Sequence, residues 1–220
     1  MDMSNFDWNG FYLPYELAIK GFILKFESIK KEYITKGLTS PIEIVTGRVK
    51  SSDSIMDKAS RIGVSLDHLE DVYDIAGVRI TCKYIQDVYD VLEMIKSRKD
   101  IEIVQVRDYI ENPKPSGYRS LHVIGKCQVE TLEGQIKVNV EFQIRTHAMH
   151  LWASIEHGLK YKYDRNIPDS IKERLYNASE IAYNLDKEMG NIKEEIIKSN
   201  VENKMEIDET EISLIQTRRW

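Results

Sequence analysis

The chain has few features that would suit a membrane or an oxidising compartment. Two of its 220 residues are cysteine, Cys82 and Cys127, and both lie in apolar stretches without the spacing of metal ligands. We therefore expect two reduced thiols in a core, not a disulfide or a zinc site. No apolar run approaches the roughly 18–20 residues that span a bilayer. Residues 1–7 are acidic and lack the apolar segment of a signal peptide. These absences favour a soluble, cytoplasmic protein.

The chain also lacks an excess of positive charge. It carries 31 lysine and arginine residues against 36 aspartate and glutamate residues, a formal net charge of -5. This balance argues against a protein that coats nucleic acid without specificity. The cations are nevertheless grouped in two short segments, Arg48, Lys50, Lys58 and Arg61 in the first and Arg107, Lys114 and Arg119 in the second. Such clusters on an acidic protein suit small anionic ligands.

Helix and strand patterns alternate along the chain. The spacing of apolar residues predicts helices over residues 14–36, 51–62 and 85–95, with a short helix at 67–71. It predicts strands over residues 42–50, 78–82, 101–106, 121–129 and 136–145. The fold class expected from this alternation is α/β (α+β), with a mixed β-sheet flanked by helices.

The strand at 136–145 carries the clearest alternation. Every second residue is apolar, from Ile136 to Ile144, and the residues between them include Glu141, Gln143 and Arg145. One face of this strand is therefore packed, and the other presents the three polar side chains in a row. That polar face is either a solvated surface or part of a site.

A longer helix is predicted to begin near Pro168. Its apolar residues follow an unbroken four–three spacing through Ile171, Leu175, Ala178, Ala182, Leu185, Met189, Ile192 and Ile196. This heptad seam packs either on its own domain or on another copy, and its length favours self-association. We divide the chain into an N-terminal tail (1–14), a main domain (15–165), an oligomerisation helix (166–198) and a polar tail (199–220).

Residues 47–54 resemble a phosphate-binding element. Arg48 and Lys50 end a strand, and the hydroxyl-rich segment up to Ser54 opens a helix whose free N–H groups attract anions. Lys58 and Arg61 lie one and two turns further along that helix. A role of these cations in surface solubility remains an alternative.

Two acids and two further arginines complete the candidate chemistry. Asp74, before Gly77, and Glu141 could share one Mg²⁺, which prefers a few hard oxygens and bound phosphate. Arg48 and Arg79 lie in strands, where guanidinium planes could stack on a flat ring. The loop at 116–122 places Tyr118 beside a cation and suits a second base.

These segments together resemble a known family. The runs TGRVK (46–50), DIAGVR (74–79), SGYRSLH (116–122), VEFQIRT (140–146), WASIEH (152–157) and YKY (161–163) occur in this order. They are similar to the synthetase domain of the RelA/SpoT-type stringent-response enzymes, over roughly residues 15–195. At this length the chain resembles the stand-alone small alarmone synthetases.

The resemblance implies an activity and an assembly. Such enzymes transfer pyrophosphate from ATP to the 3′-hydroxyl of GTP, GDP or GMP, using Mg²⁺, and yield a (p)ppGpp-type alarmone and AMP. Their fold is related to nucleotidyltransferases, and small members commonly form homotetramers through terminal helices. No membrane partner and no stable nucleic-acid complex are expected.

The resemblance also assigns roles to individual residues. Arg48 and Arg79 match the arginines that enclose the ATP adenine, and the triphosphate positions are those of Lys50, Ser54, Lys58 and Arg61. Asp74 and Glu141 match the metal-binding acids, and Glu141 is also the proposed general base. Tyr118 matches the tyrosine that stacks on guanine. The remaining acceptor and transfer positions are Arg107, Lys114, His122, Gln143 and Arg145.

Two departures from related enzymes limit the expectation. The long enzymes hydrolyse alarmones with a His-Asp dyad, and this chain has no His-Asp pair, so hydrolysis is not expected. One tetrameric subgroup binds its product at a central cleft, but the matching positions here hold Ile23, Glu27, Ile44 and His150, which argues against product activation by that route.

Two alternative functions remain at this stage. Toxin-type relatives pyrophosphorylate the 3′ end of tRNA, although a net charge of -5 suits that substrate poorly. An inactive nucleotide-binding scaffold is a second alternative, which the presence of both Asp74 and Glu141 opposes. The preferred acceptor among GMP, GDP and GTP stays open.

Overall fold

The computed structural model describes residues 6–162 and 167–217, with side chains for 6–159 and 167–200. Tyr163, the last residue of the YKY run, lies outside the described residues. The helices are α1 (Trp8–Thr35), α2 (Ser52–Ile62), the 3-10 helix η2 (Leu66–Asp71), α3 (Ile85–Lys96), α4 (His147–Lys162) and α5 (Asp169–Thr217). The strands are β1 (Ile44–Val49), β2 (Ala76–Cys82), β3 (Ile101–Asp108), β4 (Leu121–Thr131) and β5 (Gly134–Thr146).

The five strands form one mixed sheet in the order β1-β2-β5-β4-β3. β2 and β5 run parallel, and the other neighbouring pairs are antiparallel. A tight turn joins β4 to β5, where Thr131 pairs with Gly134, whose φ of 114° suits glycine. The expected fold class, a mixed sheet flanked by helices, is confirmed.

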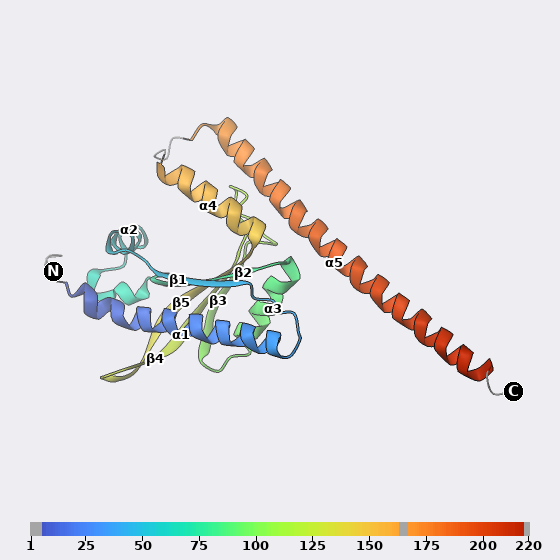
Figure 1. The fold of residues 1–220 in the computed structure, drawn as a ribbon. Helices are drawn as coiled ribbons and strands as arrows, with labels where there is room; N and C mark the ends of the chain where they lie inside the picture. Colours follow the sequence, from blue (N-terminus) through green and yellow to red (C-terminus); the bar gives the residue numbers. More distant parts are fainter. Residues whose placement is uncertain (1–5, 163–166, 218–220) are drawn as a thin grey trace.

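α1 covers one face of the sheet (Figure 1), and the buried side chains between them are apolar. Phe142 of β5 is fully buried there, and the rings of Phe22 and Phe26 meet it nearly edge-on at centroid distances of 5.1 and 6.1 Å. Such edge-to-face contacts add to the gain from burying the rings. The sheet is therefore fixed on one side by a packed aromatic core, which leaves its other face available for polar groups.

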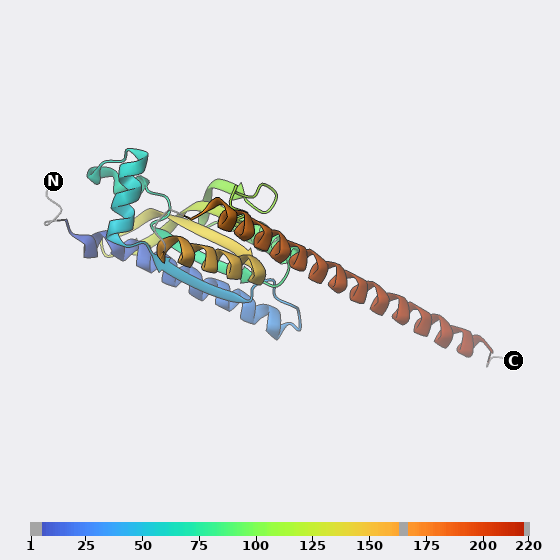
Figure 2. The same cartoon turned by 90° about the horizontal axis from the view of Figure 1, so that it is seen from above.

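The other face is partly covered by α4, which follows β5 without a loop (Figure 2). Thr146, the last residue of β5, accepts a hydrogen bond from the backbone N–H of Met149 at 3.1 Å. This contact satisfies one of the free donors at the start of α4. Trp152 of α4 then donates its indole N–H to the carbonyl of Leu175 at 2.9 Å and joins α4 to α5.

α5 contacts the domain with its N-terminal half and then extends away from it (Figure 1). The side chains that face the domain include the buried Ser179 and Asp186 and the partly buried Tyr183, which packs against the core. Of the expected heptad seam, Leu175 and Ala182 are partly buried, whereas Leu185 and Ile196 are each 56% exposed. The C-terminal part of the seam therefore does not pack on its own domain.

Two helix ends differ from the expected bounds. α1 begins at Trp8, inside the predicted N-terminal tail, because Asp7 accepts a hydrogen bond from the backbone N–H of Gly10 and caps the helix. α5 continues to Thr217, through most of the predicted polar tail. The end of α2 agrees with expectation, since Gly63 terminates it with a φ of 73°.

None of the helices in the described part of the chain combines the length and the apolar character required to cross a membrane.

Asp186 couples the stability of α5 packing to pH. It accepts a hydrogen bond from Thr146 at 2.5 Å, and its burial raises its pKa to about 6 against the opposing effects of Thr146 and His147. A carboxyl with a raised pKa binds its proton more tightly in the folded state. Its stabilising contribution is therefore present at low pH and declines as the pH rises from about 4 to 6.

We expect Asp186→Asn to gain stability relative to wild type as the pH rises from 4.5 to 7.5, because asparagine has no proton to lose. The gain should be at least about 1 kcal/mol, or roughly 2–4 °C in the unfolding midpoint of a chain of this size. Thermal unfolding at both pH values measures it, with the exposed Glu188→Gln as control. An equal stability difference at both pH values would contradict the assignment.

Candidate active site

The register of the sheet aligns polar residues from all five strands on the face toward α4. One row of paired residues runs Thr46, Arg79, Gln143, His122 and Arg107 across the sheet. In the adjacent row, Arg48 pairs with Gly77, and Gly77 pairs with Glu141. Because residues paired across strands point to the same face, residues far apart in sequence meet here.

Glu141 is at the centre of a hydrogen-bond network. Its carboxylate lies 2.9 Å from Nδ1 of His122 and accepts a hydrogen bond from Gln143 at 2.6 Å. Nε2 of His122 lies 2.7 Å from the hydroxyl of Tyr118, and Arg145 donates to that same hydroxyl. The two ring nitrogens of His122 thus contact Glu141 on one side and Tyr118 on the other, and together they fix the orientation of the ring.

The network keeps Glu141 ionised. Burial alone would raise its pKa, but the hydrogen bond and charge of His122, with help from Gln143 and Lys58, lower the pKa to about 2. Glu141 is therefore a carboxylate at any neutral or mildly acidic pH.

Asp74, just before β2, is the second acid of the site. Lys50 and Lys58 both approach its Oδ2, at 2.8 and 2.7 Å. Burial raises the pKa of Asp74, and the two lysines outweigh this effect and lower it. Its other oxygen, Oδ1, is buried and has no hydrogen-bond partner among the described residues. One oxygen of this carboxylate is thus left available for a further ligand.

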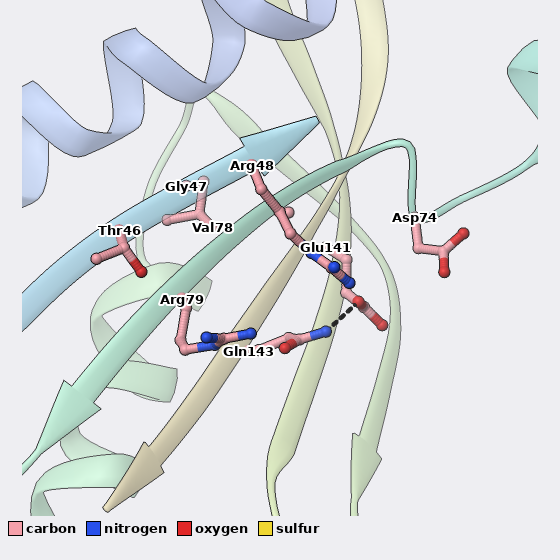
Figure 3. A pocket seen from close by; sticks show the side chains of 9 residues that line it. Thr46, Gly47, Arg48, Asp74, Val78, Arg79, Glu141 and Gln143 are labelled. Atoms are coloured by element: carbon pink, nitrogen blue, oxygen red, sulfur yellow. Dashed lines mark hydrogen bonds between the residues drawn. The ribbon is translucent and has the colours of Figure 1, made fainter. Parts of the chain in front are cut away.

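A cavity of about 640 Å³ opens over these residues, between the sheet and α4. Its lining includes six cationic side chains and three carboxylates; the cations are Arg48, Lys58, Arg79, Arg107, Lys114 and Arg145. A smaller hollow of about 150 Å³ adjoins it between β1 and β2, where Arg48 and Arg79 extend from neighbouring strands toward Glu141 and Gln143 (Figure 3). Burial and the repulsion of Arg145 and Arg48 lower the pKa of Arg79. An anionic ligand would relieve this repulsion.

The loop before β4 supplies the far wall of the cavity. Nζ of Lys114 lies 4.7 Å from the ring centroids of both Tyr109 and Tyr118. The guanidinium of Arg145 lies 5.0 Å from the Tyr118 ring. Tyr118 therefore contributes its hydroxyl to the Glu141 network and keeps its ring among cations.

Most of the predicted site residues line this cavity, and three do not. Lys50 does not line the cavity and donates to Asp74, which does. The hydroxyl of Ser54 is hydrogen-bonded to Ser51 at 2.9 Å, and Arg61 pairs with Asp57 on the exposed side of α2. The structure thus separates Ser54 and Arg61 from the other predicted residues.

The cavity also includes residues whose sequence pattern indicates no role. These are Tyr109 and Ser116 in the loop region and Ala153, Ser154, Glu156 and His157 on α4. The last four belong to the WASIEH run. Their helical spacing gave no sign of which side chains face the sheet.

The arrangement suits a metal held by few protein ligands. In the part of the chain that the structure describes, no three or more His, Cys, Asp or Glu side chains cluster as a metal site. Asp74 and Glu141 line the same cavity, and one or two carboxylates completed by phosphate oxygens and water are the usual environment of Mg²⁺. The unpartnered Oδ1 of Asp74 fits this chemistry.

A mixed sheet with an ionised acid pair inside a cationic cavity defines a protein class that acts on phosphorylated, nucleotide-sized ligands. Residues 47–166 match the family model described as the region found in RelA / SpoT proteins. The chain is 45% identical to the GTP pyrophosphokinase YjbM of Bacillus subtilis (strain 168) over 194 residues, which is 88% of this chain and 92% of YjbM. The chain therefore belongs to the RelA/SpoT family, in its small alarmone synthetase branch.

Solved structures agree with this assignment. The small alarmone synthetase 1 from Bacillus subtilis bound to its product pppGpp matches with a TM-score of 0.83 and 46% identity, over 86% of this chain and 97% of that chain. The same synthetase bound to AMPCPP matches with a TM-score of 0.77 and 41% identity, over 87% and 98%.

We expect His122→Leu to raise the pKa of Glu141 by roughly 1–2 units, because the buried carboxylate loses a charge-assisted hydrogen bond. Titration of the Glu141 carboxyl carbon by NMR measures the change. His68→Leu, an exposed histidine on η2, is the control and should leave Glu141 unaffected. An unchanged pKa of Glu141 in His122→Leu would mean that Gln143 and Lys58 are sufficient to keep this carboxylate ionised.

Proposed function

We propose that this chain transfers the β,γ-pyrophosphate of ATP to the 3′-hydroxyl of a guanosine nucleotide and releases AMP. One observation carries the proposal: Glu141 is held as a carboxylate between two cationic halves of one cavity. The first half contains Arg48, Arg79 and Lys58, and the second contains Tyr118 and Lys114. Two nucleotides could meet over Glu141.

ATP occupies the half beside β1 and β2 in this proposal. Arg48 and Arg79 extend into the hollow from adjacent strands (Figure 3), so the adenine ring could lie between their guanidinium planes. Lys58 and Lys50 bind the triphosphate, for which they must exchange part of their contact with Asp74. Ser54 and Arg61, at the start and end of α2, would contribute only after side-chain rearrangement.

The guanosine nucleotide occupies the other half. The ring of Tyr118 stacks on the guanine, and Arg107 and Lys114 attract the acceptor phosphates. His122 and Gln143 both hydrogen-bond to Glu141, and Arg145 donates to Gln143 and to the hydroxyl of Tyr118. The comparison with a synthetase bound to pppGpp supports a nucleotide of this class.

Mg²⁺ is the proposed cofactor, with Asp74 and Glu141 as its protein ligands. The metal would supply charge neutralisation on the β- and γ-phosphate oxygens. The low pKa of Glu141 limits its second proposed role, that of general base. A carboxylate of pKa about 2 is a weak base, so Glu141 would act mainly by orienting the 3′-hydroxyl and accept its proton late, as the new P–O bond forms. The surrounding cations then stabilise the transferred group.

Assembly and location complete the proposal. The exposed seam on α5, with Leu185, Met189, Ile192 and Ile196, supports a homo-oligomer, and the proposed form is a homotetramer. Cys82 and Cys127 are free and buried, and burial raises the pKa of Cys127 to about 12. Two unreactive core thiols support the proposed cytoplasmic location.

Glu141→Gln should reduce turnover by about 10²–10⁴-fold while the fold is retained, because the amide cannot carry the charge that binds metal and orients the hydroxyl. Purified protein is incubated with labelled ATP and with GMP, GDP, GTP or tRNA in turn, and AMP release is measured. Label should move to a guanosine nucleotide and not to tRNA.

Glu133→Gln, in the exposed β4–β5 turn, is the matched control and should keep full activity. A folded Glu141→Gln enzyme with more than about a tenth of wild-type turnover would refute the role of this carboxylate. Transfer to tRNA alone would refute the proposed acceptor.

For assembly, we expect light scattering at micromolar concentration to give about four times the chain mass of 25.7 kDa. Leu185→Glu combined with Met189→Glu should lower this mass without unfolding the domain, because both side chains are exposed in the single chain. A monomeric wild-type protein would exclude the proposed interface.

A further inference from the structure

The Tyr118 loop is a short closed segment with one unusual backbone position. Lys114 and Gly117 form its inner hydrogen bond, from the N–H of Gly117 to the carbonyl of Lys114 at 2.8 Å, and the N–H of Lys114 returns to the carbonyl of Tyr118 at 3.2 Å. Gly117 has a φ of 86°, a conformation that favours glycine. The carbonyl of Gly117 belongs to the peptide bond that joins Gly117 to Tyr118. The orientation of this peptide therefore influences the position of the Tyr118 ring.

That carbonyl is held by α5. The hydroxyl of Ser179 donates to the Gly117 carbonyl, and the guanidinium of Arg119 donates to the same oxygen at 3.4 Å and to the Ser179 hydroxyl at 3.1 Å. The contact is close, because a Cβ added at Gly117 would lie 2.7 Å from the Cβ of Ser179. Sixty-two residues separate the two partners in the chain.

Arg119 is fixed to the same helix from two further sides. It forms an ion pair with Glu180 at 3.0 Å, and its guanidinium lies 4.4 Å from the ring centroid of Tyr183. The residue is 8% exposed. Arg119 follows Tyr118 in sequence but is not part of the lining of the nucleotide cavity. Its charge is therefore used in binding α5.

We propose that α5 is a positioning element of the acceptor half of the site, in which Ser179 and Arg119 hold Gly117 and thereby the ring of Tyr118. This inference rests on the proposed role of Tyr118 in binding the acceptor base. Ser179 lies outside residues 47–166, the part that the family model matches. The acceptor half is thus completed by a helix that follows the matched region.

The domain-facing residues of α5 differ from its apolar seam. Ser179, Glu180 and Tyr183 contact the loop, whereas Leu185 and Met189 remain exposed. A variant that loses only the loop contact can therefore be distinguished from one that loses assembly, because the first changes the acceptor KM and the second changes the mass of the oligomer.

Ser179→Ala removes the hydroxyl without adding bulk. We expect the acceptor KM to rise about 5- to 10-fold, the effect of one buried hydrogen bond, with kcat and the ATP KM changed less than about 2-fold. This split distinguishes a weakened acceptor site from a general defect. Hydrogen–deuterium exchange of the segment at 114–118 should become faster, and the light-scattering mass should not change.

Ser199→Ala, an exposed serine on the same helix, is the matched control and should alter none of these quantities. Tyr118→Ala tests the proposed function separately and should raise the acceptor KM. In the double variant, Ser179→Ala should add little to the effect of Tyr118→Ala, because its effect passes through that ring.

Failure of the positioning role and failure of the proposed function give different results. If Tyr118→Ala raises the acceptor KM and Ser179→Ala does not, the positioning role is wrong and the proposed function stands. An equal loss in kcat and both KM values, or a lower mass, would show that Ser179 is merely structural and also overturns the inference. If Tyr118→Ala leaves the acceptor KM unchanged, the acceptor assignment itself fails and the inference fails with it.

Discussion

The site depends on keeping Glu141 charged in a place from which most water is excluded. Taking a carboxylate out of water costs several kcal/mol unless donors replace the lost hydration. His122 and Gln143 provide those donors. His122 lies on the neighbouring strand β4, and Gln143 lies on β5, the strand of Glu141 itself. The parallel pairing of β2 with β5 then brings Arg79 beside Gln143. The register of three strands therefore fixes both the charge of the acid and the cations around it.

The cavity has more positive than negative side chains, and in the ligand-free molecule this excess is unfavourable. The lowered pKa of Arg79 reflects both its burial and its arginine neighbours. Lys50 and Lys58 are accommodated only because Asp74 lies between them. A polyphosphate would compensate these charges, so the same repulsion that destabilises the empty cavity favours a strongly anionic ligand. Local charge, not the net charge of -5, determines what the protein attracts.

α5 connects parts of the molecule that are distant in sequence. Its buried polar residues contact the Tyr118 loop through Ser179 and the end of β5 through Asp186. Its apolar residues Leu185, Met189, Ile192 and Ile196 are exposed. One helix therefore contacts the Tyr118 loop and the end of β5 and also presents the surface proposed for assembly.

Periodicity in the sequence was sufficient for the strands and for the polar row of Glu141, Gln143 and Arg145, because side-chain direction alternates strictly along a strand. It also located the apolar seam of α5, since spacing along a helix is local information. It could not reveal that Arg119 would pair with α5, nor that Arg61 would turn away from the cavity. A polar side chain that faces solvent and one that faces another element produce the same pattern, and only the packing of distant segments decides between them.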